Sequence, residues 1–110
     1  MADAEQDQFA DPGRRVFGTY APEFVALTDD VMYGDVWERP GLSKRDRSLI
    51  TVASLLSLVR TDQLTHHLER ALHNGVTEQE LIDAITHLAF YAGWPAAVTA
   101  MEHLQAISER

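Results

Sequence analysis

Apolar residues in this chain recur at intervals of three and four positions, the spacing of one face of an α-helix. The first such run holds Phe24, Leu27 and Val31. It is predicted to begin at Pro22, a favourable first-turn residue, and to end at Gly34. No segment alternates apolar and polar residues as a half-buried strand would. The pattern predicts an all-α fold of five to six helices.

Further helices are expected downstream, separated by stop and start signals. Residues 46–59 are apolar almost all round, which is typical of a central buried helix. Asn74-Gly75 is a helix stop, Thr77 with Glu80 forms a capping-box sequence, and Gly93-Trp94-Pro95 breaks and restarts the chain. The predicted helices cover residues 46–59, 61–73, 78–92 and 95 onward.

The composition fits one folded domain. Hydrophobic residues make up 45% of the chain and charged residues 24%, values that are ordinary for a globular protein. Residues 1–12 are poor in large apolar groups and are expected to be a flexible N-terminal segment, with the domain over residues 13–110. A central helix that is apolar on all sides needs cover on all sides, so we expect a homo-oligomer.

Charge and cysteine content exclude several classes of function. The formal net charge is −8, with nine Lys and Arg among 17 carboxylates, which argues against binding to nucleic acid. The absence of cysteine removes disulfides, thiolate metal sites and thiol catalysis. The longest apolar run is too short to cross a membrane, and the acidic N-terminus is no secretory signal. These features predict a cytoplasmic protein.

Two adjacent histidines mark the candidate chemistry. Neighbouring helical residues point about 100° apart, so His66 and His67 cannot have the same role. His67 lies at the margin of the expected apolar stripe, whereas His66 is expected to face solvent. A residue at such a margin can line a cleft, and histidine suits proton transfer near neutral pH. A hydrogen-bonded histidine at the edge of the core is the structural alternative. No metal site is expected.

Three stretches resemble the carboxymuconolactone decarboxylase family: "YGDVWERPGLSKRDRSLITVASL", "LTHHLERALHNGVTEQEL" and "HLAFYAGWPAAVTA". The similarity runs from about Gly13 to Met101. It implies the helical fold shared with alkylhydroperoxidase D, assembled as a trimer or hexamer. The peroxidase relatives carry Glu and Cys-x-x-Cys before the histidine. Here those positions hold Ser48, Arg60 and Gln63, so the thiol peroxidase chemistry is not expected.

The resemblance implies decarboxylation of 4-carboxymuconolactone to the enol-lactone of 3-oxoadipate, with no cofactor, in aromatic (protocatechuate) catabolism. His67 would be the proton donor. A small carboxylate or lactone substrate needs cationic anchors, for which Arg39 and Arg47 are the candidates and Arg60 a weaker third. Arg47 could equally form a structural ion pair. The remaining expected substrate-binding residues are aromatic: Trp37, Tyr91 and Trp94.

Two alternatives keep the fold and change the function. The first is a related lyase or isomerase that acts on another lactone or keto acid, for example in natural-product biosynthesis. The second is a non-catalytic oligomeric binding protein.

Overall fold

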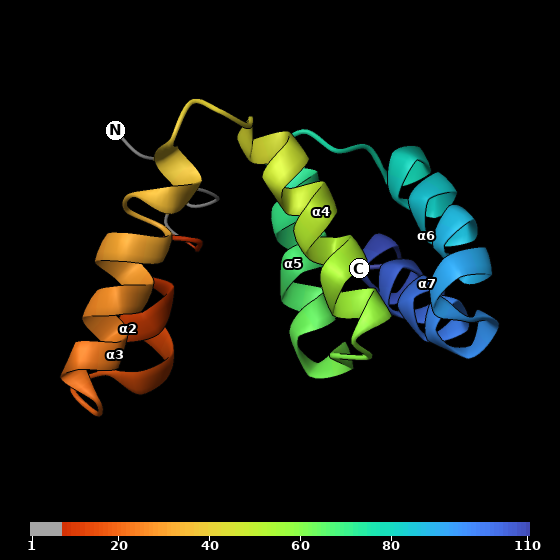
Figure 1. Ribbon diagram of the computed structural model, residues 1–110. Coiled ribbons are helices and arrows are strands. Elements are labelled where there is room, and N and C mark those ends of the chain that lie inside the picture. The colour runs from red at the N-terminus through yellow and green to blue at the C-terminus, as the bar shows by residue number, and fades with distance from the viewer. Residues whose placement is uncertain (1–7) are drawn as a thin grey trace. The chain divides into compact units, whose positions relative to one another are not determined.

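The structure is a computed structural model that describes residues 8–110 (Figure 1). Those residues contain six α-helices and no strand, which confirms the all-α prediction. The chain divides into two compact units, one ending at Lys44 and the other covering Arg45–Arg110, and each is described by itself. Most of the predicted N-terminal segment, residues 1–7, lies outside the described residues, so its boundary at residue 12 stays a prediction.

The first unit contains two short α-helices, α2 (Pro12–Phe17) and α3 (Pro22–Ala26). Helix α3 continues without a break into a π-helix, Leu27–Met32, and a 3-10 turn follows at Val36–Glu38. The helix predicted from Pro22 is therefore confirmed, although its second half is π-helical. It ends before Gly34, where a Cβ atom would lie only 2.5 Å from the carbonyl oxygen of Asp30.

Helix α2 was not predicted, because its cap comes from a distant residue. The carboxylate of Asp29 accepts hydrogen bonds from the backbone N–H groups of Gly13 (2.7 Å) and Arg14 (3.1 Å). These are first-turn donors that the helix itself leaves unsatisfied. Asp11 and Pro12 are residue types that favour a helix start, but the Asp11 side chain forms no cap hydrogen bond, and the local pattern predicts a flexible segment that ends at the Pro12-Gly13 turn.

The first unit has little core of its own. Among residues 8–44, Gly13 and Val25 are the only buried residues. Phe17 and Phe24 meet edge to face, with ring centroids 5.6 Å apart, yet both are exposed. Large apolar side chains along this unit remain open to solvent: Val16, Tyr20, Leu27, Val31, Met32, Val36 and Leu42.

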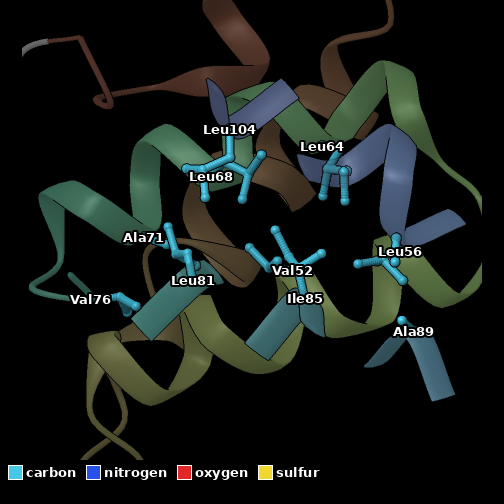
Figure 2. Packing of buried hydrophobic residues seen from close by; sticks show 12 residues of the cluster. Val52, Leu56, Leu64, Leu68, Ala71, Val76, Leu81, Ile85, Ala89 and Leu104 are labelled. Carbon is cyan, nitrogen blue, oxygen red and sulfur yellow. The ribbon is translucent and has the colours of Figure 1, made fainter. Parts of the chain in front are cut away.

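The second unit is a bundle of four helices. They are α4 (Lys44–Ser57), α5 (Thr61–His73), α6 (Glu78–Ala92) and α7 (Trp94–Ser108). Helix α7 packs against both α5 and α6. Side chains from all four helices meet in one core (Figure 2): Val52, Leu56, Leu64, Leu68, Ala71, Val76, Leu81, Ile85, Ala89, Ala97, Ala100 and Leu104.

Within the single chain, helix α4 is buried on one side only, and the expected cover of its other sides by another subunit stays a prediction. Only Ser48, Val52 and Leu56 are buried, and they lie four residues apart on one side of the helix. Ile50 is 56% exposed. Within the second unit, the other helices cover only the side of α4 that carries these three residues.

The predicted bounds of α5 and α6 are confirmed, whereas α4 begins and ends two residues earlier than the predicted 46–59 and α7 begins at Trp94, one residue before the predicted start. Thr77 Oγ1 accepts from the backbone N–H of Glu80 at 3.0 Å, and Glu80 Oε1 accepts from that of Thr77 at 2.9 Å, so the capping box is formed. Gly75 and Gly93 have φ values of 101° and 112°, in the region that favours glycine. None of the helices in residues 8–110 combines the length and apolar character needed to cross a bilayer.

The turn between α4 and α5 contains an unfavourable residue. Val59 has a φ of 58° and is largely exposed. A β-branched residue in the left-handed region costs about 1–2 kcal/mol.

We expect Val59→Asn to raise the free energy of unfolding by about 1 kcal/mol, because asparagine tolerates this conformation. Urea unfolding measures the change, with Leu58→Asn as the neighbouring exposed control; an equal gain in both variants would contradict the conformational explanation.

Candidate functional site

His67 lies on α5 beside the buried stripe, as predicted. Leu64, Leu68 and Ala71 of the same helix are fully buried in the core, and the His67 ring is half-buried at its edge. The Nδ1 atom of His67 is inaccessible to solvent. This placement leaves one part of the imidazole inside the protein and another part at its surface.

His66 does not simply face solvent, so that expectation is wrong. Its ring is half-buried and meets the His67 ring edge to face, with centroids 5.0 Å apart and planes at 82°. Its Nε2 atom lies 3.5 Å from a terminal nitrogen of Arg70. The two adjacent histidines thus belong to one cluster, although their rings leave the helix in different directions.

Arg70 is the third member of this cluster, and sequence reasoning missed it. Its side chain extends from α5 three residues after His67 and is only 7% exposed, with the Nε atom inaccessible to solvent. The sequence does carry a signal, because residues three and four apart on a helix lie on the same side. Arg70 is three residues after His67 and four residues after His66 in the sequence.

The cluster shifts the pKa of both imidazoles downward. Burial is the largest cause of lowering the pKa of His67 to about 4, and the positive charges of His66 and Arg70 add to it. Burial and Arg70 also lower the pKa of His66, while Glu69 opposes the shift. At pH 7 His67 is therefore neutral in the ligand-free protein, and it can accept a proton before it can donate one.

Hydrogen bonds to two neighbouring helices fix α5 in place. At its C-terminal end, Asn74 Nδ2 donates to the buried Ser48 Oγ of α4 at 2.9 Å. On another side, Thr65 Oγ1 and His103 Nδ1 of α7 lie 2.6 Å apart. Ser48 stands where peroxidase relatives carry a glutamate, and here it serves as an acceptor between helices.

The structure places Arg39 and Trp37 in the first unit. Arg39 is exposed and forms a bidentate ion pair with Asp35, with Nε–Oδ1 at 3.1 Å and Nη2–Oδ2 at 3.0 Å. This contact raises the pKa of Arg39 and lowers that of Asp35. Trp37 is half-buried, its ring 5.5 Å from that of Tyr33. Asp35 thus occupies the Nε and Nη2 edge of the guanidinium, and the role of Arg39 as a substrate anchor stays a prediction.

The other predicted site residues lie in the second unit. Arg47 is half-buried in the first turn of α4. Tyr91 and Trp94 flank the break between α6 and α7 and are 78% and 61% exposed. They contact His87 and Phe90 respectively, at centroid distances of 4.9 and 6.0 Å. Their predicted role as substrate-binding residues stays a prediction.

A cavity of about 320 Å³ lies between α6 and α7, apart from the histidine cluster. Its lining combines apolar side chains with acidic ones, which does not suit an anionic ligand: Glu78, Ile82, Met101, Leu104, Gln105, Ser108 and Glu109. Within residues 8–110, no three His, Asp or Glu side chains are grouped as metal ligands.

Comparison with known proteins identifies the family. The profile of the carboxymuconolactone decarboxylase family matches residues 22–106, from the start of α3 into α7. The chain belongs to this family. The matched region includes every residue of the histidine cluster and all the predicted substrate-binding residues, so the resemblance seen in the sequence motifs is confirmed.

Two similar proteins are named as decarboxylases. A 4-carboxymuconolactone decarboxylase of Acinetobacter baylyi is 47% identical over 79 residues, which cover 72% of this chain and 59% of that protein. A nitrosuccinic acid decarboxylase of Metarhizium robertsii is 41% identical over 75 residues, covering 68% and 52%. An uncharacterized 15.0 kDa protein of Paracoccus denitrificans is 26% identical over 95 residues. The chain spans little more than half the length of the first two relatives.

The lowered pKa of His67 predicts a stability that depends on pH. Between pH 6.5, the ordinary pKa, and about pH 4, the unfolded chain binds more protons at this position than the folded protein does. Stability from His67 is thus complete above pH 6.5 and falls as the pH drops toward 4. With partial exposure discounted, the loss is about 1–2 kcal/mol.

Urea unfolding at pH 7.5 and pH 5 measures this loss. We expect His67→Gln to lose less stability on acidification than the unmodified protein. His87→Gln removes an exposed histidine from α6 and should retain the full loss. An unchanged pH response in the His67 variant would show that the ring is not held neutral by its surroundings.

Proposed function

We propose that the protein is a cofactor-independent carboxy-lyase acting on a small di-acid, with 4-carboxymuconolactone as the first candidate substrate. The observation that carries the proposal is His67, half-buried beside the buried Arg70, in a chain 47% identical to a protein with that named activity. A cationic and proton-exchanging cluster is what loss of CO2 from an anionic acid requires.

The chemistry needs a place for electrons and a source of protons. When the bond to the departing carboxylate breaks, its electron pair moves toward the unsaturated lactone carbonyl, giving a dienolate, and CO2 leaves. A proton must then be delivered to carbon to form the enol-lactone. Arginine stabilises the developing oxyanion, and histidine moves the proton.

The neutral state of His67 fits this sequence once substrate charge is considered. The positive charges of His66 and Arg70 disfavour a proton on His67 in the ligand-free protein. A bound carboxylate offsets those charges and favours the protonated imidazole. Under the proposal, His67 takes up a proton as the di-acid binds and transfers it to carbon after CO2 has formed.

A second candidate substrate class follows from the Metarhizium relative. Nitrosuccinic acid, as its name states, has two carboxyl groups and a nitro group. A nitro group can accept the electron pair as a nitronate, as a lactone carbonyl accepts it as an enolate. Other acids with an electron-accepting group close to the departing carboxylate, including those of natural-product pathways, are therefore alternative substrates. A non-catalytic binding role is the outcome if none of them is turned over.

The proposal extends to assembly and setting. We propose a homo-oligomer, a trimer or hexamer, working in the cytoplasm in the breakdown of protocatechuate-type aromatic acids. The apolar side chains exposed on the first unit support association, because Val25 is the only apolar side chain that is buried among residues 8–44.

Turnover by a His67 variant tests the catalytic role. We expect His67→Ala to lower kcat for 4-carboxymuconolactone by about 10²–10⁴-fold, the range typical for loss of a general acid or base. CO2 release measures the rate, and size-exclusion chromatography checks assembly. His87→Ala, an exposed histidine, is the control and should retain activity. Full turnover by an assembled His67→Ala protein would exclude its proposed role.

Association through the first unit is tested by a charge on its exposed face. We expect Leu27→Asp to lower the molar mass measured by light scattering, because an aspartate in an apolar interface is costly to desolvate. Asp30→Asn alters an exposed polar residue of the same π-helix and should leave the mass unchanged. An unchanged mass for Leu27→Asp would place the interface elsewhere.

A further inference from the structure

The position of Arg70 is unusual for a cation. Arg70 is only 7% exposed, with its Nε atom inaccessible to solvent, and it lies on the side of α5 that also holds the two half-buried imidazoles. Burying a charge is expensive, and placing two proton-binding rings next to it adds a further cost whenever either ring is charged. An anion bound at this cluster would offset both costs at once.

We propose that Arg70, together with His66, binds one carboxylate of the substrate next to His67. This inference rests on the proposed function and extends it, because it names the residue that anchors the di-acid. The guanidinium presents a planar set of donors that matches a carboxylate, and a terminal nitrogen of Arg70 already lies 3.5 Å from His66 Nε2. A carboxylate held there reaches both side chains.

The spacing along α5 accounts for how the anchor serves the reaction. Side chains three residues apart on a helix are neighbours, about 5–6 Å between their Cβ atoms. A carboxylate on Arg70 therefore positions the adjoining carbons of a small di-acid beside the His67 ring. Anchoring and proton transfer then come from one turn of one helix.

Arg70 is better suited to this role than the two arginines expected from the sequence. Arg39 is exposed and engaged with Asp35, and an ion pair in water is worth only about 0–1 kcal/mol. A buried guanidinium interacts more strongly with an anion because the surroundings screen it less. Arg47, half-buried on α4, is the competing anchor and is included in the experiment.

Succinate is a suitable probe, because it has two carboxylates and no electron-accepting group. Imidazole resonances of the unmodified protein are followed by NMR during a succinate titration. We expect the His66 and His67 signals to shift while those of the exposed His87 remain in place. Calorimetry then gives the Kd, which should rise at least about 10-fold in Arg70→Met and less in Arg70→Lys, which keeps the charge but loses the fork.

Matched variants separate the anchor from a general effect of charge. Arg110→Met removes an exposed arginine that pairs with Glu69, and it should bind succinate as the unmodified protein does. If Arg47→Met weakens binding while Arg70→Met does not, Arg47 is the anchor and the inference is wrong. If Arg70→Met does not fold, as judged by circular dichroism, the NMR titration and the Arg70→Lys affinity decide the result.

The same variants distinguish this inference from the proposed function. If Arg70→Met binds 4-carboxymuconolactone and releases CO2 from it at the normal rate, Arg70 is not the anchor, while the lyase function stands. Succinate binding that depends on Arg70, in a protein that decarboxylates none of the candidate acids, would overturn the function and support the anion site.

Discussion

The division of helix α5 into an apolar side and a cationic side is the constraint around which the second unit is built. Leu64, Leu68 and Ala71 hold the helix in the core, and hydrogen bonds from Asn74 and Thr65 tie it to α4 and α7. These contacts determine how deeply the adjoining, cationic side of α5 is buried in the protein. Because the core stripe must be covered completely, the residues at its margin are drawn partly into the protein, and their charge states change.

That depth gives the protein a local charge opposite to its overall charge. The chain carries a formal net charge of −8, which repels a di-acid at long range. The Arg70 guanidinium reverses the sign over one turn of α5, where burial reduces screening. Neutral imidazoles at pH 7 keep the cost of this arrangement low in the absence of ligand, and a bound carboxylate makes protonation favourable. Under our proposal, the cluster thus links binding of an anion to the supply of a proton.

Much of the fold could be predicted from sequence, because helix periodicity and caps are local. Thr77 with Glu80 and the glycines at 75 and 93 mark their helix ends as the structure has them. Helix α2 was not predicted, since the carboxylate that satisfies its first-turn N–H groups belongs to Asp29, 16 residues from Gly13. For α4, the apolar composition shows which faces can be buried but not which of them find a neighbour within the chain. At the site, the helical wheel placed His67 correctly at the margin of the apolar stripe. It placed the side of α5 that carries His66 and Arg70 in solvent, and so did not show how deeply these two residues are buried.

The two named relatives clarify what such a cluster must do and what it can leave to the substrate. A lactone carbonyl and a nitro group are different electron acceptors, yet both are part of the substrate, so the protein does not need to provide one. What the two acids share is a negative charge that must be held and a carbanion-like carbon that must be protonated. Under our proposal, one buried arginine and one imidazole of this chain meet those needs on a single helical turn. A change of substrate then requires different walls around the site and no new electron acceptor in the protein.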